Sequence, residues 1–337
     1  MKLEEFELIE VIKNITEKNV PGNVLVPNGD DCFVFKENQS ILITTDSLVD
    51  GVHFKKELFP PYDLGIKSAS ANLSDIAAMG GIPKFAIISL ILPTKTKENW
   101  VTELYKGLTR TFSKYDVYIG GGNLSKGNTL SITITLIGIS NDKVLTRKGA
   151  KPGNLIFVSG TLGDSALGLK LIMEKREEHK ESEELIKFRK YLIRRHLNPT
   201  PRIELGKRIV NIATSCIDIS DGLLQDLNHI LKSSKVGAKI KLENIPISPG
   251  YNHLVEEFLK KGKDNYLNRL KYALTGGEDY ELIFTVPNDR KDEIQKISKE
   301  LKLKITEIGQ ITEGSQIEIY SNNKKIKKNF FKGWQHF

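Results

Sequence analysis

Residues 43–54 read ITTDSLVDGVHF, and the rest of the chain is most easily understood from this stretch. An apolar run typical of a buried strand leads into it and ends in three oxygen-bearing side chains, Thr44, Thr45 and Asp46. An Asp-Gly pair then predicts a turn, and His53 follows it. A strand holds its last residues rigidly, so this stretch predicts an oxygen-rich edge of a sheet, which is the kind of edge that suits Mg²⁺.

Hydrophobic periodicity on both sides of this stretch predicts an α+β unit. The segment 62–79 is rich in small residues and ends at Gly80-Gly81, so we expect a helix that packs closely against a neighbour. The segment 130–139 alternates apolar and polar residues, which is the pattern of a half-exposed antiparallel strand. The other elements expected here are a helix at 3–18, strands at 41–45, 84–92 and 117–121, a strand after the GDDC of 29–32, and a helix at 96–114.

A second unit is expected after a turn-rich boundary at 141–154, and we divide the chain into domains at 1–145 and 146–337. Strands that run directly into helices, as in SCIDISDGLLQDLNHIL, predict an α/β architecture for the second domain. The expected strands are 155–160, 215–220, 279–286, 305–309 and 316–320, and the expected helices begin near 163, 221 and 289.

Composition limits the function classes. The chain has 337 residues, of which 39% are hydrophobic and 27% charged, a balance that is typical of a globular protein. Its longest apolar run, 85–92, is too short to span a bilayer, and its N-terminus lacks the order of a signal peptide, so we expect a cytoplasmic protein without a membrane partner. The net charge of +8 comes from lysines mixed with acids, without a nucleic-acid-binding motif, so no nucleic-acid partner is expected. Cys32 and Cys216 lack metal-type spacing, and we interpret them as buried thiols.

Several acids lie at the ends of predicted elements. Taken singly, each is typical of a turn or a helix cap. Facing one site together, they would repel one another unless cations neutralised them, and carboxylate and hydroxyl oxygens favour Mg²⁺ over Zn²⁺. There is no GxxxxGK[ST] loop, so phosphates are expected at helix N-termini near 163–165 and 220–222, with Arg147 as a candidate clamp. The acids are Asp30, Asp31, Asp46, Asp75, Asp218 and Asp221.

Five motifs in order resemble the thiamine-monophosphate kinase family. They are GDD at 29–31, TTDSLVDGVHF at 44–54, NLSDIAAMGG at 72–81, DISDG at 218–222 and GEDYEL at 277–282. The relatives of this family include aminoimidazole ribonucleotide synthetase, selenophosphate synthetase and a hydrogenase-maturation protein, all of which use ATP. The resemblance runs almost from end to end of the chain.

The resemblance implies a two-domain α/β fold whose N-terminal mixed sheet forms a barrel in a homodimer. It also implies Mg²⁺-dependent transfer of a phosphoryl group from ATP to thiamine monophosphate. The implied ligands of several magnesium ions are Asp30, Thr44, Thr45, Asp46, Asp75, Asn123, Asp218 and Asp221. The implied ATP contacts are Tyr105, Gly122, Asn123, Arg147 and Ser220, and the implied contacts to thiamine monophosphate are His53, Glu278 and Trp334.

The sequence departs from this family at one position and leaves two alternatives open. Asn123 stands where the family usually has an acid, so the local ion should bind more weakly. Another ATP-using enzyme of the superfamily is one alternative, although the reactive cysteines of selenophosphate synthetase and of the hydrogenase-maturation protein have no counterpart here. The other alternative is a non-catalytic nucleotide-binding protein. No catalytic nucleophile is expected, because direct transfer forms no phosphoenzyme, and no general base is needed because the acceptor phosphate is already anionic.

Overall fold

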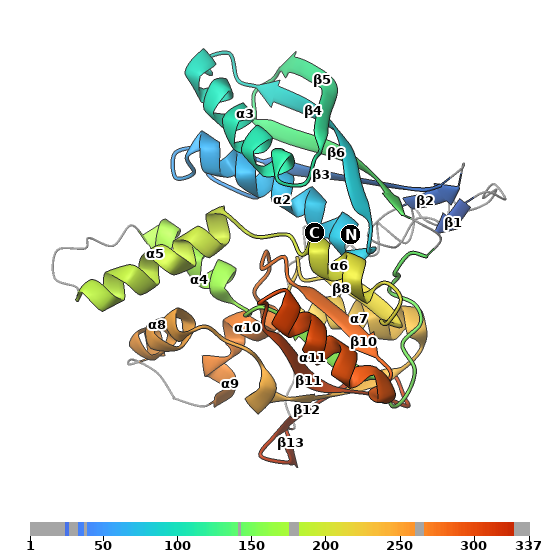
Figure 1. Ribbon diagram of the computed structural model, residues 1–337. Coiled ribbons are helices and arrows are strands. Elements are labelled where there is room, and N and C mark those ends of the chain that lie inside the picture. The colour runs from blue at the N-terminus through green and yellow to red at the C-terminus, as the bar shows by residue number, and fades with distance from the viewer. Residues whose placement is uncertain are drawn as a thin grey trace, which may run out of the picture.

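The computed structural model describes residues 24–26, 33–36, 39–140, 143–174, 182–259 and 266–326. Asp30, Trp334 and the helix predicted at 3–18 lie outside these residues. Within them the chain forms two sheets, each with its own helices, and Figure 1 shows one above the other. The expected mixed α/β architecture is therefore confirmed. The division of the chain at residue 145 stays a prediction.

The first sheet contains strands from the first 140 residues in the order β1-β2-β3-β6-β4-β5. Only β4 and β5 pair in parallel, so the sheet is mixed, as expected. The strands are β1 (Val24–Val26), β2 (Phe33–Lys36), β3 (Ser40–Val49), β4 (Ile82–Leu92), β5 (Tyr118–Lys126) and β6 (Ser131–Ser140).

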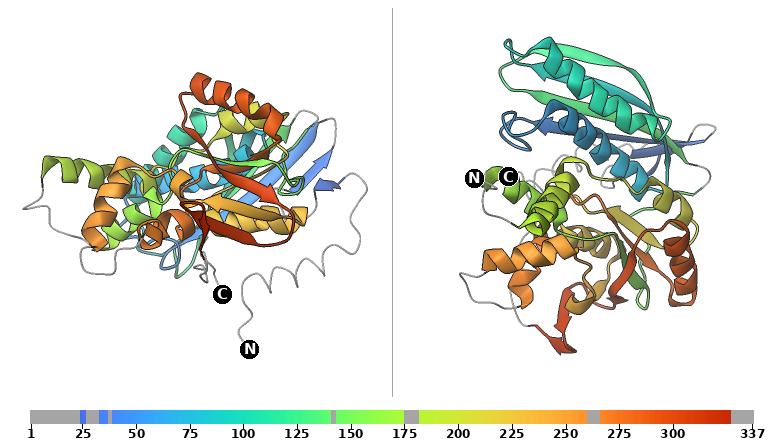
Figure 2. Two further views of the ribbon diagram at one scale, coloured as in Figure 1. Left: turned by 90° about the horizontal axis from the view of Figure 1, so that it is seen from below. Right: turned by 60° about the vertical axis from the view of Figure 1, so that its left-hand side comes forward.

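Two helices, α2 (Pro61–Ala78) and α3 (Glu98–Ser113), cover one face of this sheet and pack against each other. The right-hand view of Figure 2 shows them side by side. Small residues permit the close approach: a Cβ on Gly107 would lie 2.0 Å from the carbonyl oxygen of Tyr62. The other face of the sheet carries large exposed apolar side chains, namely Phe85, Ile87 and Ile91 on β4 and Tyr118 on β5.

The second sheet has the order β13-β12-β9-β11-β7-β10-β8, and only β9 and β12 pair in parallel. Every residue of β7, β8 and β10 is buried, because alternate side chains enter two hydrophobic clusters on opposite faces of the sheet. The strands are β7 (Leu155–Ser159), β8 (Ser215–Asp218), β9 (Gly237–Lys241), β10 (Leu282–Val286), β11 (Ile305–Thr312), β12 (Ile317–Ser321) and β13 (Lys324–Lys325).

Helices of the second half surround this sheet (Figure 1). One hydrophobic cluster runs from α2 through α6 to β8 and α11, so the two halves share a core. The helices are α4 (Asp164–Glu174), α5 (Glu183–Leu197), α6 (Ile203–Ile209), α7 (Leu223–Ser234), α8 (Pro249–Leu259), α9 (Tyr266–Arg269), α10 (Lys271–Thr275) and α11 (Lys291–Glu300), with short 3₁₀ turns at Leu242–Asn244 and Asn288–Arg290.

Most of the predicted elements within the described residues are confirmed, including the antiparallel strand expected at 130–139. The prediction of a strand from residue 279 was wrong for its first residues, because the backbone at 278 and 280 is left-handed and β10 begins only at Leu282. The sequence reading missed β9 and α8. In the part of the chain that the structure describes, no helix is long and apolar enough to cross a bilayer.

Candidate active site

The stretch that opened the sequence analysis forms the outer half of β3. Thr44 and Asp46 share the strand face that points toward α2, and Thr44 is buried while Asp46 is exposed. The backbone N–H of Asp46 donates to Oδ1 of the buried Asn72 on α2, at 3.2 Å. The Thr45 side chain lies on the opposite face, where its hydroxyl donates to the carbonyl oxygen of Ile134 at 3.1 Å. A metal ion on the Asp46 face of the strand could therefore bind only the backbone carbonyl oxygen of Thr45, and not its hydroxyl.

Helix α2 joins this strand to the second sheet through two neighbouring residues. The Thr44 hydroxyl donates to Oδ2 of Asp75 at 2.5 Å. The hydroxyl of Ser74 donates to Oδ2 of Asp218, at the end of β8, at 2.7 Å. These two hydroxyl–carboxylate bonds link β3, α2 and the end of β8, so they bring Asp75 and Asp218 toward Asp46, which lies two residues further along β3.

The junction between β8 and α7 carries Asp218, Ser220 and Asp221. Gly222 follows with φ +115°, a conformation that side chains other than glycine rarely adopt. Oδ2 of the buried Asp226 accepts the backbone N–H groups of Asp221 and Gly222 at 3.1 and 3.0 Å, so it caps this turn. Asp221 and Ser220 remain partly exposed at the end of the strand.

The loop after α10 is fastened to this junction. The N–H of Glu278 donates to the carbonyl oxygen of Ser220 at 2.7 Å, and that of Tyr280 donates to the carbonyl oxygen of Ile219 at 2.9 Å. A Cβ on Gly277 would lie 2.3 Å from the same Ser220 oxygen, so glycine is required there. Glu278 and Tyr280 have φ values of +64° and +52°. Such conformations are rare for residues with a side chain and occur often at functional sites.

The phenol of Tyr280 marks the centre of this arrangement. Tyr280 is 6% exposed. Burial raises its pKa well above the usual value, and four nearby carboxylates, from β3, α2, β8 and the loop itself, raise it further. These are the carboxylates of Glu278, Asp46, Asp218 and Asp75. The structure thus brings together four of the residues that the sequence singled out.

A buried charged cluster supports Glu278. Nζ of the fully buried Lys67 lies 2.9 Å from Oε1 of Glu278 and 3.0 Å from Nε2 of His196. Burial alone would raise the pKa of Glu278, but Lys67 and His196 lower it below its usual value, and His53 contributes to the lowering. His53 therefore lies near Glu278, and its Nδ1 accepts the N–H of Val49 at 3.0 Å.

Lys67, His196 and Tyr280 were missed by the sequence reading. One signal was available: Lys67 is a lone charge within the small-residue run of α2, on a helix that buries nearly all of its residues. A buried lysine is rare and needs a partner, so its position could have indicated an ion pair.

Arg147 lies beside α7. Its carbonyl oxygen accepts from the hydroxyl of Ser234 at 3.1 Å. Burial and nearby positive charges, that of Arg147 among them, together lower the pKa of His229 to about 4, so the guanidinium of Arg147 lies near that ring. His229 in turn belongs to a group with Asp221 and Asp226 whose ligand atoms lie within 4.8 Å of one another. Arg147 therefore lies on the Asp221 side of the site.

Three of the predicted site residues lie away from the acids around Asp46, namely Gly122, Asn123 and Tyr105. Asp46 pairs with Ile134, Ile134 with Ile88, and Ile88 with Gly122 across the first sheet. Gly122 and its neighbour Asn123 on β5 are thus three strands, roughly 14 Å, from Asp46. That separation is too large for one magnesium ion to bridge, since its ligands lie about 2.1 Å away.

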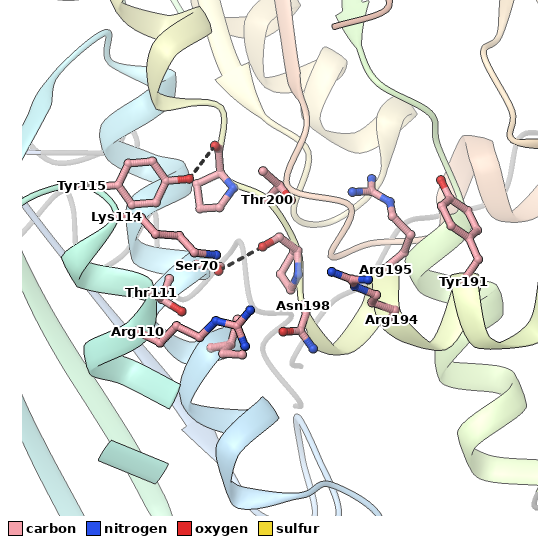
Figure 3. A pocket seen from close by; sticks show the side chains of 13 residues that line it. Ser70, Arg110, Thr111, Lys114, Tyr115, Tyr191, Arg194, Arg195, Asn198 and Thr200 are labelled. Carbon is pink, nitrogen blue, oxygen red and sulfur yellow. Dashed lines mark hydrogen bonds between the residues drawn. The ribbon is translucent and has the colours of Figure 1, made fainter. Parts of the chain in front are cut away.

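Tyr105 lies on α3 and lines an open pocket of about 860 Å³ together with Tyr62 and Arg110. A second pocket, of about 250 Å³, lies between α2, α3 and the end of α5. Figure 3 shows Arg110 and Lys114 extending into it from one side and Arg194 from the other. It contains none of the predicted site residues.

The donor atoms gathered around Asp46 fit magnesium. They are carboxylate and hydroxyl oxygens at the ends of rigid elements, which are the hard ligands that Mg²⁺ prefers. Among the described residues, the cluster with metal-ligand spacing is Asp221, Asp226 and His229, and it adjoins the same junction.

Comparison with known proteins agrees with this geometry. Residues 29–140 match the family "AIR synthase related protein, N-terminal domain", and residues 151–322 match its C-terminal domain. The chain is 39% identical over 336 residues to thiamine-monophosphate kinase of Aquifex aeolicus, which covers 100% of this chain and 99% of that protein. The chain belongs to the thiamine-monophosphate kinase family. The resemblance seen in the five motifs is therefore confirmed.

Other members of the thiamine-monophosphate kinase family are equally similar. The enzyme of Buchnera aphidicola subsp. Acyrthosiphon pisum is 40% identical over 344 residues, with all of both chains covered. The solved structure of AaThiL complexed with AMPPCP and TMP is 38% identical, with a TM-score of 0.84 over 100% of this chain and 99% of that one. The fold and its chain order are therefore those of this kinase family.

Proposed function

We propose that this protein transfers the γ-phosphoryl group of ATP to the phosphate of thiamine monophosphate and so forms thiamine diphosphate. The observation that carries the proposal is the convergence of Asp46, Asp75 and Asp218 through the Thr44 and Ser74 hydroxyls. This oxygen-rich centre lies beside Glu278. The chain also belongs to the thiamine-monophosphate kinase family, which supports the same reaction.

The carboxylates would hold several magnesium ions, which neutralise phosphate charge during phosphoryl transfer. Asp46 and Asp75 approach from the first sheet and its helix, and Asp218 and Asp221 from the β8–α7 junction. Ser220 precedes the start of α7, where unbonded N–H groups and the helix dipole favour an anion. Arg147 adds a guanidinium on that side of the site.

The acceptor needs little activation. A phosphate oxygen is already anionic at neutral pH, so no general base is required, and the residues have mainly to align two anionic groups. Glu278 and His53 would orient the thiamine moiety, since its thiazolium is cationic and its aminopyrimidine can donate a hydrogen bond. Trp334, which lies outside the described residues, is proposed as a third contact.

A second copy of the chain would complete the assembly. The uncovered face of the first sheet carries Phe85, Ile87 and Tyr118, each more than 45% exposed. Apolar patches of this kind typically lie in interfaces. We propose a homodimer in which these faces close a barrel. Gly122 and Asn123 would then serve a site that one chain does not complete, and Tyr105 would contact the adenine of ATP.

The activity is tested by incubating the purified protein with thiamine monophosphate, ATP and Mg²⁺ and separating the thiamine species by chromatography. We expect thiamine diphosphate, and no meaningful product from free thiamine, whose hydroxyl would need a base. Equal rates on thiamine and on its monophosphate would contradict the mechanism. Absence of product at all Mg²⁺ concentrations would contradict the function.

The dimer is tested separately by sedimentation. Ile87→Asp and Tyr118→Asp should shift the protein toward the monomer, because each places a charge within the apolar face. A wild-type protein that sediments as a monomer at micromolar concentration would overturn the proposed assembly.

A further inference from the structure

Lys67 is a charged residue in the interior of the protein. It lies midway along α2, and its side chain is fully buried. An ammonium group without partners is costly to bury, so its surroundings must balance the charge. Two groups contact it: Oε1 of Glu278 at 2.9 Å and the ring of His196, whose Nε2 is 3.0 Å away.

His196 contributes a neutral ring to this contact. It is fully buried, and burial together with the neighbouring Lys67 lowers its pKa to about 3. A neutral imidazole protonated at Nδ1 can donate to the Ser165 hydroxyl, 2.9 Å away, and accept from Lys67 at Nε2. The ring therefore fixes the direction of the Lys67 ammonium, while the carboxylate of Glu278 balances its charge.

Glu278 is the exposed end of this chain of contacts. Its side chain is 26% exposed, while those of Lys67 and His196 are fully buried. Oε1 is occupied by Lys67, and Oε2 lies 3.7 Å from Nδ1 of His196. The left-handed backbone at Glu278 and its N–H bond to Ser220 fix the base of the side chain. The carboxylate is thus held from its buried side and open on the other.

Helix α2 also carries Asp75, eight residues after Lys67 and on the same rigid rod. The separation along the axis is roughly 12 Å, at 1.5 Å per residue. Lys67 therefore fixes the position of the Glu278 carboxylate relative to Asp75 as well, because Lys67 and Asp75 belong to the same helix.

We propose that Lys67 is a positioning residue for the acceptor substrate: it fixes the Glu278 carboxylate, relative to the metal-type acids on the same helix, for the cationic thiamine moiety. This inference rests on the proposed function. Lys67 acts through Glu278 and makes no contact with the reacting phosphates.

Binding of thiamine monophosphate without ATP, measured by calorimetry, tests the proposal. Lys67→Met removes the charge at similar length, and we expect binding to weaken by about tenfold or more, because the carboxylate loses its orientation. KM for ATP should stay unchanged. The control, Lys207→Met, removes an exposed lysine that pairs with Glu204 on the surface, and it should leave binding unchanged.

A double-mutant cycle separates positioning from an independent effect. If Lys67 acts through Glu278, the variant Lys67→Met/Glu278→Gln should bind thiamine monophosphate no more weakly than Glu278→Gln alone. Additive losses would overturn the proposal. Equal binding by wild type and by folded Lys67→Met would overturn it as well, with the proposed function intact.

Two further outcomes have defined meanings. Wild-type protein that neither binds nor phosphorylates thiamine monophosphate would contradict the proposed function itself. If Lys67→Met fails to fold, Lys67→Arg replaces it, because arginine keeps the charge but is longer and forked. That variant should weaken the binding of thiamine monophosphate and spare KM for ATP, and a folded variant with unchanged binding would overturn the proposal.

Discussion

Two groups of acids near the 277–281 loop have very different surroundings. Glu281 is fully buried, and the guanidinium groups of Arg202 and Arg195 lie 2.5 and 3.0 Å from its Oε1. Asp46 lies on an exposed part of β3, and Asp75 accepts a hydrogen bond from a neutral hydroxyl. Glu281 is therefore neutralised by arginines within the fold, whereas Asp46 and Asp75 present carboxylate oxygens on β3 and α2. The difference agrees with a structural role for Glu281 and with the proposed metal-binding role of Asp46 and Asp75.

The largest expected effect is on turnover. Asp46→Asn should lower kcat by roughly a thousandfold, about 4 kcal/mol, because the amide carries no charge for a metal. The melting temperature should change little, since the side chain is exposed. Asp75→Asn is expected to behave in the same way, and Glu204→Gln, at an exposed ion pair, is the control for both. Near-normal activity at saturating Mg²⁺ would mean that the altered residue is no metal ligand.

The second effect is on stability. Glu281→Gln should lower the free energy of unfolding by about 3 kcal/mol, because Arg202 loses its buried ion-pair partner. Arg195 keeps the more distant Asp164, at 3.7 Å. Urea denaturation measures this loss.

The matched control is Glu293→Gln, which breaks an exposed pair with Arg290 and should change stability little. If the two variants lose equal stability, the contrast between buried and exposed acids fails.

The third effect is on the pH dependence of stability. His196 has a pKa of about 3 in the folded protein, against 6.5 for the free side chain. Below pH 6.5 the unfolded chain therefore binds a proton that the folded chain does not, and stability falls as the pH falls toward 3. Between pH 7 and 5 the loss should be about 2 kcal/mol. His196→Gln should remove this part of the acid sensitivity, and an unchanged pH profile of urea denaturation would contradict the assignment.

The smallest effect concerns Asn123, which lies three strands from Asp46 and would serve the site proposed to need a second chain. Asn123→Asp should lower the Mg²⁺ concentration for half-maximal activity by a factor of about three, because a carboxylate binds the ion more tightly than an amide. Specificity for the acceptor should not change. If magnesium dependence stays the same in a titration of initial rates, this position has no part in metal binding.

The sequence predicted Asp46, Asp75 and Asp218 better than it predicted the buried ion pairs. Asp46 and Asp218 end strands, and Asp75 lies in a helix of small residues, so local patterns and the family motifs both indicated them. The contact between Lys67 and His196 joins residues 129 positions apart, and no local pattern reveals such a pairing. The strand β9 has five residues and begins at a glycine, and α8 begins with Pro-Gly, so both resemble loops in sequence.

Register and backbone conformation were equally hidden. The distance of Asn123 from Asp46 depends on which strands pair across the first sheet. Strands β6 and β4 lie between β3 and β5, and this order differs from the order of the strands in the sequence. The left-handed conformation of Glu278 follows from the loop's bonds to Ser220 and Ile219. Neither can be read from residue types alone.

The left-handed backbone at Glu278 has a consequence for how this position can change. A glycine there would relieve the conformation, which costs a residue with a side chain about 1–2 kcal/mol. It would also remove the carboxylate. That carboxylate also balances the charge of the buried Lys67, and removing one partner of a buried ion pair costs about 3–5 kcal/mol. This loss outweighs the backbone relief, so selection for heat resistance and selection for growth that depends on thiamine diphosphate should both keep glutamate at 278.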